Sequence, residues 1–195
     1  MAVELVRHCF TVEEYHRMAQ AGILTEDDRV ELIEGEIVEM SPIGIRHAAC
    51  VRRLNRLFSG WAGERAIVDI QNPIRLGGRS EPQPDLVLLR PRPDLYAASH
   101  PGPEDVLLVV EVAETSADAD RAIKVPLYAR AGIPEVWLVD LAGEYVEVYR
   151  DPTPPGYQLL QRVQRGQYLS PQALPDMALA VGDILPPLSD GGADL

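Results

Sequence analysis

The chain has 195 residues, of which 46% are hydrophobic and 25% are charged, a balance that is typical of a folded globular protein. The length predicts one domain, and 18 basic against 30 acidic side chains give a formal charge of −12. Proteins that coat nucleic acid indiscriminately carry a basic footprint, so this charge argues against that class but leaves a local basic face open. The basic residues comprise 17 arginines and a single lysine, Lys124.

The cysteines and the apolar runs indicate where the protein resides. Cys9 and Cys50 are too far apart in the sequence for a Cys-x-x-Cys pair and make no disulfide framework, so a reducing cytoplasm is expected. The longest apolar run, 106–113, is interrupted by Glu111 and is shorter than the roughly 18 residues that span a bilayer. The amino terminus has no apolar core of secretory type. We therefore expect a cytoplasmic protein without a membrane partner.

The first elements along the chain are a helix and a hairpin. The pair Thr11 and Glu14 has the spacing of a capping box, which places a helix at about 12–21. Residues 29–40 then predict two short strands that are joined by a two-residue turn.

A second helix is predicted over 47–61, where apolar residues recur at helical spacing. Its opposite face carries Arg52, Arg53 and Arg56, in a stretch of the chain where basic residues outnumber acidic ones. This face is either an ordinary solvated surface or a surface that contacts phosphate groups.

The rest of the chain is dominated by strands. The first of them are expected at 66–71, 73–76, 85–89 and 106–112. A helix over 118–131, disturbed by Pro126, precedes strands at 135–140 and 144–149. The proline-rich part from 151 onward predicts short strands and loops. The fold class is therefore α/β in the mixed α+β sense, with a central mixed sheet that helices flank.

Two carboxylates are notable for the strands that contain them. Glu111 lies within the most apolar run, where burial of a carboxylate costs several kcal/mol unless a cation or a metal compensates it. Asp85 directly precedes the apolar residues 86–89. If the two strands are neighbours in the sheet, the pair offers oxygen ligands that favour Mg²⁺, Mn²⁺ or Ca²⁺ over zinc. The alternatives are a solvated edge strand for Glu111 and a strand-end cap for Asp85.

Lys124 is unusual because every other basic residue is arginine. An ammonium is a compact charge whose pKa can be lowered, whereas a guanidinium stays protonated and planar. A lysine therefore suits activation of a water, or neutralisation of the charge that develops on a phosphoryl group beside a metal. The alternative is that one lysine on a surface helix has no special role.

Several runs of residues point to a known family. They are VVEVAETS at 109–116, DRAIK at 120–124, YARAGIP at 128–134 and VWLVD at 136–140. Upstream of them are QPD at 83–85 and the segment 31–42, with His47 just after it. In this order the runs resemble the Uma two (Uma2) family, a large group of bacterial proteins in the PD-(D/E)XK restriction-endonuclease-like superfamily. The resemblance covers nearly the whole chain.

The resemblance implies a single restriction-endonuclease-like domain. Its parts would be an N-terminal helix and hairpin at 10–42, a core at 45–150, and C-terminal strands with a tail at 151–195. Glu31, His47 and Gln83 match family positions near the site, where they would have supporting roles. By analogy a homodimer is expected, because two sites would then engage the two strands of DNA.

The resemblance also implies a Mg²⁺-dependent endonuclease that hydrolyses DNA phosphodiester bonds. Asp85 and Glu111 would bind Mg²⁺, or Mn²⁺ in its place, and Lys124 would activate the attacking water. The superfamily pattern has this lysine two residues after the second acid, where the chain has Ala113, so the match places it on the next helix. The alternatives are a nuclease-like fold without catalysis, which would serve protein interaction or regulation, and a hydrolase of another phosphoester.

Overall fold

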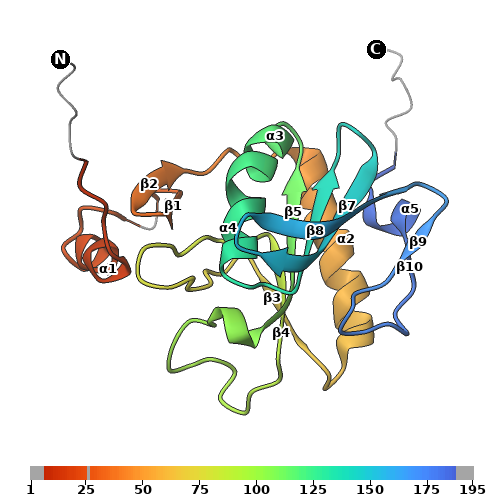
Figure 1. Ribbon diagram of the computed structural model, residues 1–195, viewed down its shortest axis with the longest axis horizontal. Helices are drawn as coiled ribbons and strands as arrows, with labels where there is room; N and C mark the ends of the chain where they lie inside the picture. Colours follow the sequence, from red (N-terminus) through yellow and green to blue (C-terminus); the bar gives the residue numbers. More distant parts are fainter. Residues whose placement is uncertain (1–6, 26, 188–195) are drawn as a thin grey trace.

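The computed structural model describes residues 7–25 and 27–187, which are arranged around a six-stranded sheet (Figure 1). In spatial order its strands are β3 (Ile67–Ile70), β4 (Leu86–Leu89), β5 (Val106–Ala113), β6 (Glu135–Asp140), β7 (Tyr145–Thr153) and β8 (Gly156–Gln164). All pairs of neighbouring strands in this sheet are antiparallel except β5 and β6, which are parallel. The predicted mixed α+β fold with a central mixed sheet is therefore confirmed.

Helices cover both faces of this sheet. α2 (Ile45–Ala62) packs on the face that carries Leu86 and Leu88, and the connection between β5 and β6 packs on the face that carries Val87 and Leu89. Successive side chains of a strand point to opposite faces, so one apolar strand supplies both cores. None of the helices among the described residues is long and apolar enough to cross a membrane.

The connection between β5 and β6 is helical over 117–130 but irregular in the middle of that stretch. It consists of α3 (Ala117–Ala119), a π-helical turn η2 (Asp120–Lys124) and α4 (Val125–Arg130). The disturbance that the sequence predicts at Pro126 is present, since the π turn ends two residues before it. Proline has no N–H and its ring crowds the carbonyl four residues earlier, and a wider turn relieves both problems.

The N-terminal part forms the helix and the hairpin that the sequence predicts. These are α1 (Val12–Gln20), β1 (Val30–Ile33) and β2 (Glu36–Glu39). Thr11 and Glu14 make both hydrogen bonds of the capping box. The turn residues Glu34 and Gly35 both have positive φ, as the preferred two-residue hairpin turn requires. A Cβ atom at Gly35 would also lie only 2.7 Å from Cβ of Cys9, so glycine is needed there.

The prediction of a strand at 73–76 is wrong. The Ile74 N–H does bond to the carbonyl of Pro82, but Pro73 and Pro82 have no N–H of their own, so a regular ladder cannot continue along this segment. It is instead an irregular loop that faces residues 80–82.

The C-terminal part is more regular than predicted. Its prolines Pro154 and Pro155 occupy the turn between β7 and β8, so β8 extends over nine residues as an edge strand of the main sheet. The elements that follow are short: β9 (Tyr168–Leu169), β10 (Leu179–Ala180) and α5 (Val181–Ile184).

The two cysteines are expected to differ in reactivity. Cys50 is completely buried in α2, and burial raises the pKa of its thiol to about 12, whereas Cys9 is half-buried. The thiolate is the reactive form, so a thiol reagent at about pH 8 should modify Cys9 in the folded protein and reach Cys50 only after denaturation. Peptide mass spectrometry measures this. Modification of both thiols at equal rates in the folded protein would contradict the burial of Cys50.

Candidate active site

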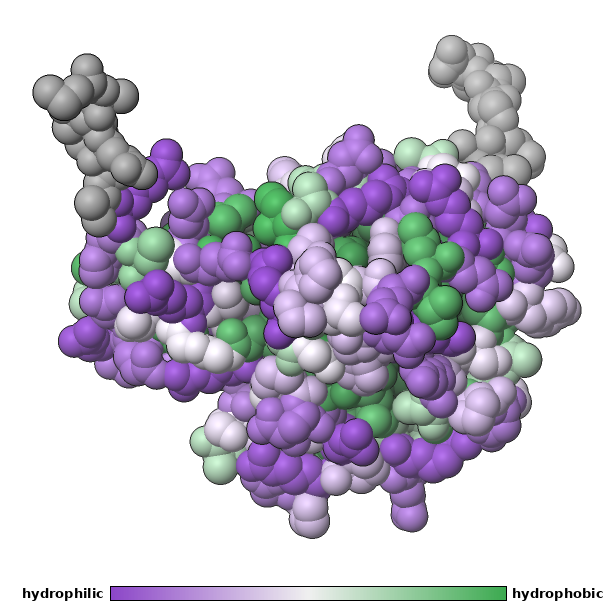
Figure 2. All heavy atoms as spheres, in the orientation of Figure 1, coloured by the Kyte–Doolittle hydropathy of each residue, from purple (hydrophilic) through white to green (hydrophobic). Residues whose placement is uncertain are grey.

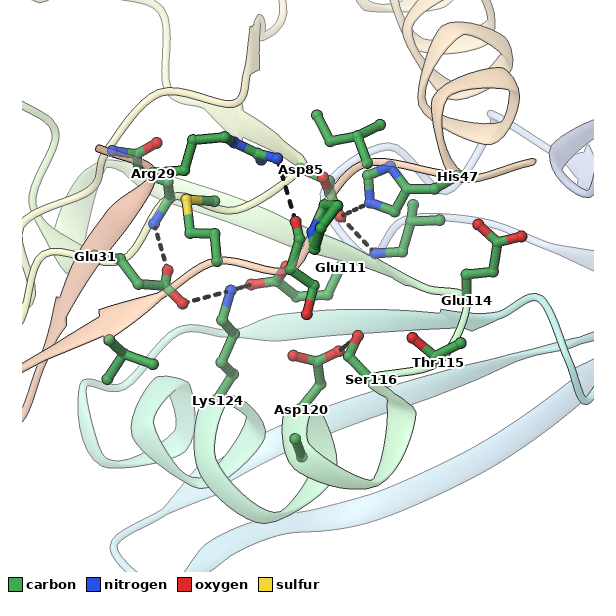
Figure 3. Close-up of a pocket in the computed structure, with 18 of the residues that line it drawn as sticks. Arg29, Glu31, His47, Asp85, Glu111, Glu114, Thr115, Ser116, Asp120 and Lys124 are labelled. Atoms are coloured by element: carbon green, nitrogen blue, oxygen red, sulfur yellow. Dashed lines mark hydrogen bonds and ion pairs between the residues drawn. The ribbon is translucent and has the colours of Figure 1, made fainter. Parts of the chain in front are cut away.

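One cavity of about 490 Å³ brings together six of the residues that the sequence indicates (Figure 3). They are Glu31, His47, Gln83, Asp85, Glu111 and Lys124. They come from the hairpin, the first turn of α2, the segment before β4, strand β5 and the turn η2. The cavity therefore lies where the hairpin meets the central sheet and its crossover helix.

Asp85 and Glu111 lie side by side on neighbouring strands. Leu86 is paired with Val110 in the antiparallel register of β4 and β5, so the residue before β4 falls opposite Glu111. Residues in this relation have Cβ atoms about 5 Å apart on the same face of a sheet. The expectation that the two strands are sheet neighbours is confirmed.

Three hydrogen bonds hold the Asp85 carboxylate. Its Oδ2 atom accepts the Val112 N–H at 2.8 Å and lies 3.1 Å from Nε2 of His47. Its Oδ1 atom accepts Nε2 of Gln71 at 3.2 Å. The bond to Asp85 raises the pKa of His47, although burial opposes the shift. Asp85 is thus a fixed carboxylate, and the contact of His47 with the site runs through it.

Glu111 is a buried acid on a central strand. Its residue is 4% exposed and β5 has a neighbour on each side, so the alternative of a solvated edge strand is wrong. Burial raises the pKa of Glu111 to about 8; Lys124 opposes this shift, and the carboxylates of Asp85 and Asp120 add to it. The Tyr128 hydroxyl donates to Oε1 of Glu111 at 2.6 Å. A carboxylate in these surroundings needs a compensating cation to stay ionised.

Lys124 lies between two carboxylates. Its Nζ atom is 3.1 Å from Oε1 of Glu31 and 3.3 Å from Oε1 of Glu111. Burial alone would lower the pKa of Lys124, but the charges of Glu111 and Glu31 raise it above its ordinary value. Lys124 is not a surface residue, since its side chain is 14% exposed and lines the cavity.

Glu31 and Gln83 connect the hairpin to the sheet. The backbone N–H of Gln83 donates to Oε2 of Glu31 at 3.1 Å, next to a β-bridge between Leu32 and Glu81. The other carboxylate oxygen of Glu31 is the one that contacts Lys124. Glu31 therefore joins the site as the partner of the lysine, and Gln83 holds Glu31 through its backbone.

Further polar residues around the cavity were not indicated by the sequence patterns. Asp120 lines it and accepts a hydrogen bond from Oγ of Ser116 at 2.7 Å, and burial raises the pKa of Asp120. Asp120 and Tyr128 stand four residues before and after Lys124, and this spacing is the signal that could have revealed them. Gln71 carries no such signal, because only the pairing of β3 with β4 brings it to Asp85.

Arg52, Arg53 and Arg56 do not line the cavity. Arg52 and Arg56 are exposed on α2, and Nε of Arg53 donates to the carbonyl of Asp183 at 2.9 Å. Within residues 7–25 and 27–187, the arginine ion pairs involve other arginines, which leaves these three without a carboxylate partner. Contact between this surface and phosphate groups stays a prediction.

The chemistry of the donor set fits Mg²⁺. Asp85 and Glu111 offer carboxylate oxygens, and Mg²⁺ is commonly held by one or two carboxylates while it keeps several waters. No group of three or more His, Cys, Asp or Glu side chains in the described part of the chain could hold a metal ion. Waters and substrate would therefore have to complete the coordination.

Comparisons with known proteins place the chain in a family. The model of the Uma2 family, which is described as "Putative restriction endonuclease", matches residues 12–182, a range that contains every residue of the cavity. A solved structure from Anabaena variabilis ATCC 29413, described as "a putative nuclease belonging to DUF820", has a similar fold. The TM-score is 0.74 at 17% identity, over 90% of this chain and 97% of that chain. The comparison with curated proteins gave no match. The chain therefore belongs to the Uma2 family of putative restriction endonucleases.

Proposed function

We propose that the protein is a Mg²⁺-dependent endonuclease that hydrolyses phosphodiester bonds of DNA in this cavity. The observation that carries the proposal is the convergence of Asp85, Glu111 and Lys124, with Nζ of the lysine 3.3 Å from Glu111. Membership of a family described as endonucleases supports the reaction class. The fold shared with a protein described as a nuclease is consistent with it.

Asp85 and Glu111 would hold the ion, and Mn²⁺ could replace Mg²⁺. The bound metal would polarise a phosphoryl oxygen and lower the pKa of a water. The chain's own part is to keep the two carboxylates in place. Gln71, His47 and the Val112 N–H orient Asp85, and the Tyr128 hydroxyl orients Glu111.

Lys124 would act as a charged donor. Its raised pKa keeps the amine protonated between Glu31 and Glu111, so it is poorly suited to accept a proton from water. It can instead orient the attacking water and offset the negative charge that develops on the phosphoryl oxygens. The family resemblance implies that this lysine activates the attacking water, and the geometry favours orientation of the water and stabilisation of charge over proton removal.

Metal dependence tests the proposal. Wild-type protein is expected to cleave plasmid and structured DNA with Mg²⁺ or Mn²⁺ and to lose this activity in EDTA. Asp85→Asn should reduce cleavage by about 10³-fold, because it removes a charged ligand. Asp176→Asn is the matched control, since Asp176 is an exposed carboxylate, paired with Arg65, that does not line the cavity.

Calorimetric titration with Mg²⁺ separates binding from catalysis. The wild type and Asp176→Asn should bind the ion, and Asp85→Asn should bind it far more weakly. A wild-type protein that neither binds Mg²⁺ nor cuts DNA would overturn the proposal. That result would favour a nuclease-like fold that serves protein interaction.

A further inference from the structure

The groups assigned to catalysis are largely buried. The side chains of Asp85, Glu111 and Lys124 are 12%, 5% and 14% exposed, respectively. The cavity around them, about 490 Å³, lies within the range of about 300–1,000 Å³ in which pockets enclose single small molecules. Duplex DNA is a stiff rod whose bases are stacked inside, so a site that also binds a base takes an extruded or single-stranded nucleotide.

Part of the mouth of the cavity is apolar. Val38 on β2, Ile43 before α2 and Ile123 in η2 line it and are 38%, 44% and 50% exposed. Figure 2 shows hydrophobic side chains in the hollow between the hairpin and α3. Grouped apolar side chains that remain exposed mark binding sites. The phosphates and sugars on the outside of a duplex give apolar side chains little surface to pack against. An unpaired base, by contrast, presents a flat apolar face.

The charges around the cavity also disfavour a long polyanion. Arg29 and Lys124 are the arginine and lysine side chains that line it. The acids that line it are Glu31, Glu39, Asp85, Glu111, Glu114 and Asp120. A duplex-binding surface neutralises several phosphates at once, and this cavity lacks the cations for that. A single nucleotide brings its phosphate only to the metal-binding end.

We propose that the substrate is an unpaired stretch of a DNA strand, from which one nucleotide enters the cavity. Its base would pack against Val38, Ile43 and Ile123, and its phosphate would face Asp85 and Glu111. This inference rests on the proposed nuclease function and adds the class of substrate. It also assigns the apolar residues of the mouth to substrate binding.

Cleavage of three DNAs of one sequence tests this inference. A single strand, and a duplex with an unpaired bubble, are expected to be cut at least about tenfold faster than the fully paired duplex. Ile123→Asn and Ile43→Asn should slow cleavage of the single strand about tenfold, because each removes part of the surface on which the base packs. Leu159→Asn is the matched control: Leu159 is 56% exposed on β8, lies outside the cavity, and should leave the rate unchanged.

Binding gives a readout that does not depend on catalysis. Fluorescence anisotropy with a cleavage-resistant phosphorothioate oligonucleotide, in the presence of Mg²⁺, should show tighter binding of the single strand than of the duplex. Binding of the single strand should weaken in Ile123→Asn and Ile43→Asn and stay unchanged in Leu159→Asn. Thermal unfolding checks that each variant is folded, and the two mouth variants lie in different segments, so both need not fail together.

The outcomes separate the two proposals. Equal cleavage of duplex and single strand, or equal rates for the mouth variants and Leu159→Asn, would overturn the unpaired-strand inference and leave the nuclease proposal intact. If no DNA is cut, the nuclease proposal fails. The binding measurement then decides whether the cavity prefers an unpaired strand. Equal affinity for duplex and single strand would then overturn the inference as well.

Discussion

Replacement of Lys124 by methionine is expected to reduce DNA cleavage by about 10³-fold, while the protein stays folded and binds Mg²⁺. Methionine fills a similar volume but cannot donate to the attacking water or offset charge on the phosphoryl oxygens, and the loss of one such donor costs about 10²–10³-fold. Single-turnover cleavage measures the chemical step, calorimetry the affinity for Mg²⁺, and thermal unfolding the fold.

Lys124→Arg separates charge from shape. The ammonium sits 3.1 Å and 3.3 Å from the carboxylates of Glu31 and Glu111, a space in which the planar guanidinium cannot reproduce a compact charge. We expect this variant to lose at least about 10²-fold in cleavage. Arg130→Met is the control, since Arg130 is an exposed cation of α4 that pairs with Glu34. Wild-type rates for both lysine variants would remove Lys124 from the mechanism.

Replacement of Arg121 by methionine is expected to lower the free energy of unfolding by about 3 kcal/mol. Its guanidinium donates to Glu147 at 2.7 Å and to Asp140 at 2.6 Å. The side chains of these acids are 1% and 8% exposed, so they cannot turn to water when the cation is removed. The same contacts attach η2, which carries Lys124, to strands β6 and β7. Urea denaturation with an unchanged m-value measures the loss.

Arg162→Met provides a control that involves the same acid. Arg162 donates to Glu147 at 2.9 Å, but its side chain is 58% exposed. Water screens an exposed pair, so the loss should stay below about 1 kcal/mol. If the two variants lost the same stability, the contribution of Arg121 would not come from its buried contacts.

Much of this protein was predictable from short stretches of sequence. The capping box of Thr11, the two-residue turn of the hairpin and the alternation of the strands are local, because each depends on backbone preferences or on side chains a few residues apart. Glu111 was recognisable for the same reason, as a carboxylate inside an apolar strand. The irregular loop at 73–76 was not, because its conformation depends on Pro73 together with Pro82 in the segment that it faces.

The assembled site depends on contacts between distant segments. Gln71 reaches Asp85 only because β3 pairs with β4, and Glu31 reaches Lys124 only because the hairpin packs against the sheet. The sequence by itself determined which acids and which lysine to consider, since burial patterns and residue types are local properties. The tertiary structure decided that they line one cavity together with exposed apolar side chains, and that neighbouring carboxylates raise the pKa of the lysine. Those properties arise from long-range packing and from the electric field of neighbouring carboxylates, neither of which a local pattern encodes.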